Sequence, residues 1–477
     1  MIAITKKLEE LGHKAIDDSW YNRIEEWDSW YKGNVKKFHS FSVWNGQHRV
    51  KCSRYSLGMA KKVCEDWANL LMNEKVKITL EGEKEQAFVD EIFTREDFEV
   101  NANELQEKGA ARGTYAIIPR VEGVTVNSRG DVLPGGRIAL DYVTAEQIFP
   151  LSWSGRRIME CAFATTTVKG DDRIVYLQIH RIDGGEYVIE NRLYTEKNGT
   201  LYEEDAGSVE GFESVPPIYR TGSDKPQFVV GRLNIANNIE DNNPMGISVY
   251  ANAIDILKAV DIAYDSYVNE FVLGKKRIMV KPAATKKILG DGIEEYVFDP
   301  NDVTFYVLPE DMSDGDLIQP IDMQLRTADH SQGLQEQLNQ LSSKCGFGEK
   351  HYQFNQGSVA TATQIISENS DMFRSIKKHE IVLESVLTEL CRTLLRMGNQ
   401  YLSAGLNEDV EISIDFDDSI IIDKAQEEAR IYQMLAAGLM GPVEARALLM
   451  NEDEETARAA LPNMETLTSG EGQNEVE

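Results

Sequence analysis

Three carboxylates near the C-terminal end have the residue types and spacing of a catalytic or metal-binding cluster. Asp415, Asp417 and Asp418 stand in the run IDFDDS, which follows a short apolar stretch. Paired carboxylates can bind Mg²⁺ or perform general acid–base catalysis, as in a carboxylate-dependent hydrolase. The same pattern also marks the end of a strand before a helix, with Asp423 as the N-cap, and we favour this structural interpretation.

Other patterns typical of catalysis or cofactor binding are missing. The sequence contains no nucleophile elbow, no HExxH pair, no Walker A loop and no dinucleotide fingerprint. His379 and Glu380 fall mid-helix without a second histidine four residues on, so we expect both on the surface. The five cysteines are scattered without a CxxC pair, which argues against a disulfide scaffold or a zinc site. We therefore predict no enzyme, no cofactor and no metal.

A glycine-bounded loop carries a second polar cluster. Residues 346–358 read GFGEKHYQFNQGS and separate two expected helices. The polar side chains of interest in and just before this loop are Lys344, Lys350, His351, Gln353 and Asn355. Such side chains can contact phosphate groups, but the composition is equally typical of a long surface connector.

The charge balance restricts the class of partner. The 477 residues include 50 Lys and Arg against 79 Asp and Glu, which gives a net charge of −29. A protein that grips nucleic acid usually carries a basic surface, so a sequence-specific DNA-binding protein is disfavoured. A protein past which DNA slides without sticking is compatible with this charge. No run of about 18 apolar residues is present, so we expect no membrane-spanning segment.

The arrangement of helices and strands indicates an α+β fold. The first 110 residues read as helical, apart from a short strand at 75–80. Within them, Trp20, Trp27 and Trp30 fall near one face of a helix, which predicts a packing anchor, with a partner-docking surface as the alternative. Residues 114–219 alternate between strand patterns and turn signals, which predicts an antiparallel meander.

The order of elements in the second half of the chain predicts a stalk with a tip. A long helix at 247–273 precedes a small island of strands and acidic turns at 283–322, and a second helix follows at 328–345. After the loop, a very long helix over 360–402 would span about 60 Å, because each helical residue adds about 1.5 Å. Two helices that flank an insertion are typical of a stalk.

Three segments in this order and spacing resemble the portal proteins of tailed phages, and most closely the SPP1-type portal family. They are LGMAKKVCEDWANLLMNEKVKI at 57–78, NPMGISVYANAIDILKAVDIAYDSYVNEFVLGKKRIMV at 243–280 and TATQIISENSDMFRSIKKHEIVLESVL at 361–387. The resemblance covers roughly residues 15–450. It implies an α+β, portal-like multi-part subunit with wing, stem, clip and crown, whose long helices form an oligomeric ring.

Matching helices assigns each part of the chain by resemblance. In chain order the implied parts are the wing (1–245), a stem helix (246–273), the clip (274–327), a second stem helix (328–345), the channel loop (346–359), the long wing helix and strand (360–420), the crown helices (421–462) and a disordered tail (463–477). The stalk and tip expected from the residues thereby correspond to the stem and clip.

The resemblance also implies a function. Proteins of this family form a ring, typically of about twelve subunits, at one capsid vertex, through which double-stranded DNA is packaged and ejected. The implied partners are other copies of the chain, non-specifically bound DNA, the terminase large subunit, head-completion adaptors, and the major capsid and scaffolding proteins. The implied location is the virion, after assembly in the bacterial host cytoplasm, with no membrane partner.

Two groups of residues become candidate sites through this resemblance. We expect the channel-loop side chains to approach DNA, namely Lys344, Lys350, His351, Gln353 and Asn355. We expect the clip carboxylates Asp311, Asp314 and Asp316 to face the motor and the adaptors. The alternative function is another phage head morphogenesis protein, such as a minor capsid or connector protein. A carboxylate-dependent hydrolase is a more distant alternative.

Overall fold

The computed structural model divides the chain into two compact units, Met1–Asp415 and Phe416–Glu477. The second unit contains helices α10 (Lys424–Ala436), α11 (Pro442–Met450) and α12 (Glu454–Ala460). The residues that the structure describes are 2–73, 75–123, 125–126, 132–133, 135–169, 172–205, 207, 209, 211–212, 215–274, 277–280, 286–288, 294–296, 305–307, 318–321, 324–354, 362–416, 424–450 and 454–461.

Helix α2 (Asp18–Tyr31) provides the aromatic anchor of the first unit. Its residues Trp20, Trp27 and Trp30 are all buried, and the rings of Trp20 and Trp27 meet edge to face at 5.7 Å between centroids. Aromatic side chains bury large areas, so this face holds the helix firmly against the core. The prediction of a packing anchor is confirmed.

The N-terminal part of the first unit contains further helices. They are α1 (Ile2–Glu10), α3 (Met59–Leu71), α4 (Glu83–Arg95) and α5 (Phe98–Arg112). Helices α3 and α5 pack against each other, and both contact α2. The apolar side chains of α3 recur with helical spacing on one face, and Val63, Cys64 and Trp67 on that face are fully buried.

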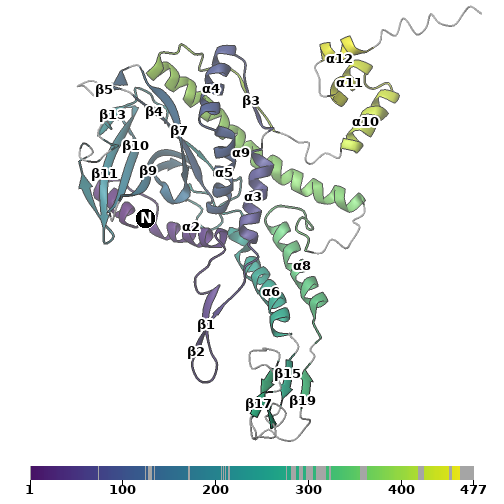
Figure 1. Cartoon of the computed structure of the whole chain (residues 1–477). Coiled ribbons are helices and arrows are strands. Elements are labelled where there is room, and N and C mark those ends of the chain that lie inside the picture. The colour runs from purple at the N-terminus through teal and green to yellow at the C-terminus, as the bar shows by residue number, and fades with distance from the viewer. Residues whose placement is uncertain are drawn as a thin grey trace, which may run out of the picture. The chain divides into compact units, whose positions relative to one another are not determined.

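Two antiparallel sheets lie in the part of the first unit that follows these helices in the sequence (Figure 1). The larger has the order β12–β11–β10–β9–β8, with β13 also beside β11. Its strands are β8 (Ile148–Ser154), β9 (Arg157–Lys169), β10 (Asp172–Asp183), β11 (Glu186–Lys197), β12 (Thr200–Glu204) and β13 (Ile218–Arg220). The smaller has the order β14–β4–β7, formed by Val229–Gly231, Tyr115–Glu122 and Arg137–Thr144. The antiparallel strands expected from the alternating pattern are therefore present.

One hairpin differs from the helical reading of the first 110 residues, which is wrong at this point. Strands β1 (Ser40–Trp44) and β2 (Arg49–Ser53) pair antiparallel with each other (Figure 1). Asn45 and Gly46 stand at the turn, where the Asn45 side chain accepts hydrogen bonds from two backbone amides and Gly46 has a φ of 98°. An Asn-Gly pair between alternating residues is a hairpin signal, and this signal was missed.

Two strands at distant points of the sequence pair with each other. Strand β3 (Lys77–Leu80) lies antiparallel to β20 (Ile412–Asp415), with Asp415 opposite Lys77. Both segments are expected as strands from the sequence, but the alternation of apolar and polar residues in a strand does not identify the strand with which it pairs. This pairing places Asp415 in a strand, whereas Asp417 and Asp418 lie outside the described residues.

The helix–insertion–helix order of the second half is present. Helix α6 (Ile254–Leu273) packs beside α8 (Thr327–Lys344), and the 41-residue helix α9 (Ala362–Leu402) follows. Helix α6 begins later than expected, because residues 251–253 form a 3₁₀ turn. Short strands lie between α6 and α8, namely β15 (Arg277–Val280), β16 (Lys286–Ile288), β17 (Glu294–Tyr296), β18 (Phe305–Val307) and β19 (Ile318–Ile321). Strand β15 pairs parallel with β18 and antiparallel with β19.

A buried histidine lies in the core of the larger sheet. His180 contacts the rings of Phe163 and Phe228 edge to face, and neither of its ring nitrogens has a hydrogen-bond partner among the described residues. Burial lowers the pKa of His180 to about 3. The folded state therefore keeps this imidazole neutral at pH values where an exposed histidine is charged.

We expect this histidine to make the fold acid-sensitive. The unfolded imidazole gains a proton below about pH 6.5 and the folded one does not, so between pH 7 and 5 the free energy of unfolding falls by about 2 kcal/mol. This stability is fully present above the unfolded pKa and is lost as pH falls toward the folded pKa.

Urea unfolding at both pH values should show a smaller loss of unfolding free energy in His180→Leu than in wild type. His48→Leu, at an exposed position, is the control. Equal losses in all three proteins would contradict the expectation.

Candidate functional site

The segment expected as a channel loop begins where helix α8 ends. Gly346 has a φ of 91°, and the amides of Gly346 and Phe347 donate to the carbonyls of Ser343 and Ser342 at 3.2 and 2.9 Å. This is the hydrogen-bond pattern of a glycine helix end. A Cβ at Gly346 would lie 3.2 Å from the ring of Trp67, so the close approach also favours glycine. The turn directs the next residues onto helix α3.

The indole of Trp67 on α3 is the point where three elements meet. Phe347 stacks on it at 4.9 Å between ring centroids, and the His379 ring of α9 meets it edge to face at 4.7 Å. The indole Nε1 donates to the carbonyl of Cys345 at 3.0 Å. Trp67 is fully buried. The start of the loop is therefore packed against α3 and α9.

The expected surface position of His379 and Glu380 is wrong. Both residues are only 6% exposed, because α9 packs against the rest of the first unit along this stretch. The His379 Nδ1 accepts a hydrogen bond from the backbone amide of Asn234 at 3.0 Å. Burial, together with the nearby charge of Lys378, lowers the pKa of His379 to about 4. The neutral His379 ring therefore packs against Trp67 as part of the core.

The carboxylate of Asp66 fixes the next part of the loop. The Tyr352 hydroxyl donates to Asp66 Oδ2 at 3.0 Å, and His351 Nε2 lies 3.4 Å from the same oxygen. Lys62 Nζ lies 2.6 Å from Oδ1. Burial alone would raise the pKa of Asp66, but the hydrogen bonds from His351, Lys62 and Tyr352 outweigh burial and lower it. Asp66 therefore stays charged and holds the loop to α3.

The structure separates the predicted loop residues into two groups. His351 contacts Asp66, whereas Lys344 and Gln353 are exposed and Lys350 is half-buried. Within the described part of the chain, neither Lys344 nor Lys350 forms an ion pair, so both ammonium groups are open to an anion. Asn355 lies outside the described residues.

The clip carboxylates Asp311, Asp314 and Asp316 also lie outside the described residues. The base of their insertion is described. Arg326, which precedes α8, donates to both oxygens of Glu270 on α6 at 3.1 and 2.9 Å, and its backbone amide donates at 2.9 Å. The side-chain and backbone hydrogen bonds of Arg326 lower the pKa of Glu270 to about 2. The two helix ends are thus joined where the insertion starts.

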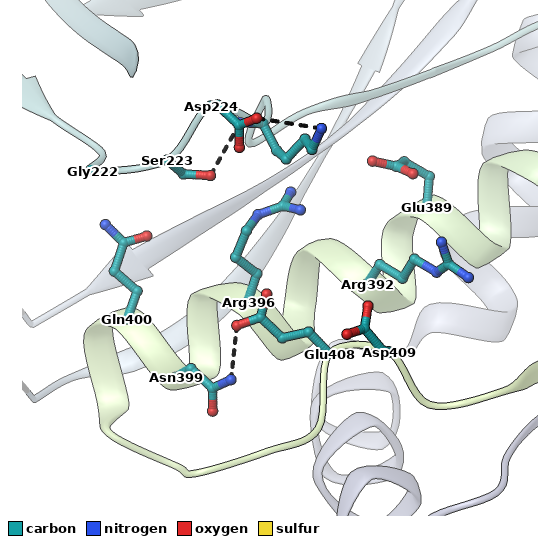
Figure 2. Close-up of a pocket in the computed structure, with 11 residues that line it drawn as sticks. Gly222, Ser223, Asp224, Glu389, Arg392, Arg396, Asn399, Gln400, Glu408 and Asp409 are labelled. Atoms are coloured by element: carbon teal, nitrogen blue, oxygen red, sulfur yellow. Dashed lines mark hydrogen bonds and ion pairs between the residues drawn. The ribbon is translucent and has the colours of Figure 1, made fainter. Parts of the chain in front are cut away.

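The C-terminal part of α9 borders a pocket of about 820 Å³ (Figure 2). Its charged lining residues are Asp224, Lys225, Glu389, Arg392, Arg396, Glu408 and Asp409. Arg396 extends toward the 222–225 loop and donates to the carbonyl of Pro226 at 3.0 Å, while Asn399 donates to Glu408 at 2.9 Å. Charges of both signs are mixed, so the pocket favours neither an anion nor a cation.

The sequence points to Lys344 and Lys350 but not to the side chains that hold the loop. Nothing in the sequence links Asp66 or Trp67 to a loop almost 300 residues away. No group of three or more His, Cys, Asp or Glu side chains that could hold a metal ion occurs among the described residues. No helix in the described ranges is both long and apolar enough to span a membrane.

The sequence matches a known family over nearly its whole length. The family model described as "Phage portal protein, SPP1 Gp6-like" matches residues 13–461. The chain belongs to this family of phage portal proteins. The resemblance drawn from three segments is thereby confirmed, and the protein has a portal or connector function. The portal family is a structural one, and its members are components of phage particles.

Solved structures give a second comparison. One chain, from a structure described as "Neck of native GTA particle computed with C12 symmetry", is similar to this portal protein at 13% sequence identity. The match covers 82% of this chain and 89% of that chain, with a TM-score of 0.36. A comparison with curated proteins gave no match.

Proposed function

We propose that this portal protein assembles into a ring of about twelve copies whose central channel passes double-stranded DNA during packaging and ejection. The observation that carries the proposal is the family match over residues 13–461. The net charge of −29 supports it, because an acidic channel wall repels phosphates and lets DNA slide. The ring would stand at one capsid vertex of the virion, after assembly in the host cytoplasm.

Within this ring we propose the same division of the chain that the resemblance implied. The parts are the wing (1–245 and 360–420), the stem (246–273 and 328–345), the clip (274–327), the channel loop (346–359), the crown (421–462) and a C-terminal tail (463–477). The pairing of α6 with α8, joined by Glu270 and Arg326, supports a stem that carries an insertion at its end.

The first experiment is the native mass and shape of the purified protein. A ring of about twelve 53.7 kDa chains would have a mass of roughly 640 kDa. Mass photometry measures that mass, and negative-stain images show whether a central hole admits duplex DNA, about 20 Å wide. A compact small oligomer without a hole would overturn the ring proposal.

We propose that Lys344 and Lys350 make transient contacts with DNA in the channel. The contacts of the loop with Trp67 and Asp66 support this, because they fix the loop while both ammonium groups stay open. Each lysine that meets a phosphate releases a counterion, so Lys344→Ala/Lys350→Ala particles should retain at least about threefold less DNA. Quantification of DNA in purified particles tests this. Lys6→Ala/Lys14→Ala, at exposed positions of equal charge, is the control. Unchanged DNA content in the loop variant contradicts the proposal.

The clip carboxylates Asp311, Asp314 and Asp316 remain a proposed docking site for the terminase large subunit and the head-completion adaptors. Acidic turns can attract basic partner surfaces and accelerate their encounter. Replacement of all three by asparagine, followed by co-sedimentation with each partner, tests the proposal. Unaltered binding of both partners would count against it. The major capsid and scaffolding proteins are the further partners that we propose for the assembled ring.

A further inference from the structure

One stretch of this strongly acidic chain contains no acidic residue. Residues 29–64 hold eight of the 50 Lys and Arg residues and none of the 79 Asp and Glu residues. Lys32, Lys61 and Lys62 in this stretch pair with carboxylates outside it. Arg54 donates a side-chain hydrogen bond to the carbonyl of Phe38. The remaining cations of the stretch, whose side chains form no ion pair with a described carboxylate, are Lys36, Lys37, Arg49 and Lys51. The centre of this stretch is the β1–β2 hairpin.

The two faces of the hairpin differ in chemistry. Successive residues of a strand point to opposite faces, so the register places Trp44 with Arg49 and Lys51 on one face. The other face carries Val43 opposite Val50. These side chains are open to solvent, with exposed fractions of 63% for Trp44 and 47% for Val43. The hairpin thus presents a basic face with a tryptophan and an apolar face.

The hairpin is incomplete as a sheet. Strands β1 and β2 pair with each other and form a two-stranded sheet, separate from the other sheets of the described structure (Figure 1). An isolated two-stranded hairpin is marginally stable in water, and an exposed strand edge invites pairing with another chain. A protein surface that covers the apolar face would stabilise it.

The base of the hairpin is fixed to helix α6. Asp261 on α6 is buried, and its carboxylate lies 2.9 Å from His39 Nε2, just before β1. The same carboxylate accepts from the Ser56 hydroxyl at 3.0 Å and the Leu57 amide at 2.8 Å, just after β2. Arg54 covers the rings of Phe38 and Phe41. A hairpin that is held at both ends but open along its length is suited to reach a partner.

We propose that the β1–β2 hairpin docks onto an acidic surface of a neighbouring copy of this chain. The rest of the chain holds all 79 acidic residues, so a second copy offers the complementary charge. Duplex DNA would match the basic face, but its grooves offer nothing to cover Val43 and Val50, whereas a protein surface covers both. The contact is heterologous, with different patches on the two copies, and heterologous contacts that close generate rings. This inference rests on the proposed ring and names one contact that holds it.

A charge reversal of the hairpin tests the proposal. Arg49→Glu/Lys51→Glu should lower the assembly constant by at least about tenfold, because two attractions become repulsions. Lys6→Glu/Lys14→Glu changes the charge equally at exposed positions on other elements and is the matched control. Mass photometry over a concentration series measures assembly, and thermal unfolding of the monomer shows that the variants fold. Assembly of the hairpin variant at the wild-type level overturns the hairpin contact and leaves the ring proposal standing.

Two further readouts separate the remaining outcomes. A photo-reactive amino acid in place of Trp44 should cross-link to an acid-rich peptide of another copy, and cross-links within the same copy alone contradict the proposal. Binding of a 30-base-pair duplex, measured by fluorescence anisotropy, should be equal for the hairpin variant and the control variant. If the hairpin variant loses duplex binding but assembles normally, the hairpin binds DNA and the proposed contact between copies is wrong. A wild-type protein that stays monomeric at every concentration overturns the ring proposal together with this contact.

Discussion

Replacement of Trp67 by alanine is expected to lower the free energy of unfolding by about 3–5 kcal/mol, because the change leaves a large cavity in a packed core. The indole is fully buried between Phe347 and His379, and it also donates to the Cys345 carbonyl. Chemical denaturation measures the loss. Hydrogen exchange should show faster opening of residues 346–352, since the loop loses the surface on which it packs.

The same chain offers a matched control for this change. Trp44→Ala removes an equally large ring from a position that is 63% exposed, and we expect it to change the unfolding free energy of the monomer by less than about 0.5 kcal/mol. Trp67→Phe keeps an aromatic ring but removes the Nε1 donor, so its loss should be intermediate. A Trp67→Ala protein with normal stability and normal loop protection would show that the loop does not depend on this ring.

Replacement of Asp261 by alanine is expected to cost about 3–5 kcal/mol of stability, because it removes one partner of a buried ion or hydrogen-bond pair and leaves the others unsatisfied. Three groups contact this carboxylate: the Nε2 atom of His39, the hydroxyl of Ser56 and the backbone amide of Leu57. The loss should be accompanied by faster hydrogen exchange in the β1–β2 hairpin, whose two ends these groups anchor. Chemical denaturation and hydrogen exchange of the monomer measure both effects.

Asp265, one turn further along α6, provides the comparison. Its carboxylate accepts from the Tyr55 amide at 3.0 Å but is half-exposed, so Asp265→Ala should cost no more than about 1 kcal/mol. A double-mutant cycle of His39→Ala and Asp261→Ala should give a coupling of at least about 1 kcal/mol, since the two side chains are in contact. Equal effects of Asp261→Ala and Asp265→Ala, or a coupling near zero, would refute the anchoring role of Asp261.

The periodic patterns of the sequence predicted the antiparallel strands within residues 114–219 and the long helix expected at 360–402, which the structure has at Ala362–Leu402. Strands β9 to β11 and helix α9 carry a sustained period of 2 or 3.6 residues. Such a period arises because one face of the helix or strand is buried. It can therefore be recognised in the sequence without knowing which element packs against that face. The family also followed from the sequence, because three segments resemble it in order and spacing, and the family model matches residues 13–461.

The structure differs from the expectations where an element is very short or where tertiary packing overrides the local sequence pattern. The β1–β2 hairpin has strands of five residues with few buried side chains, so its hydrophobic signal was weak although its Asn-Gly turn was plain. His379 and Glu380 are polar residues on a helix, which on average favours the surface. They are buried because α9 passes through the first unit at that point and the Asn234 amide satisfies the ring.

By itself, then, the sequence determined the α+β class, the helix–insertion–helix order, the charge of −29 and the portal family. Only the tertiary structure decided which distant residues meet. Asp66 and Trp67 receive the loop after α8, Asp261 receives both ends of the hairpin, and β3 pairs with β20. Hydrophobic periodicity shows that one face of an element is buried, but it does not identify the element that covers this face. Hydrogen bonds and ring contacts join residues far apart in the sequence, and no local pattern indicates which residues will meet.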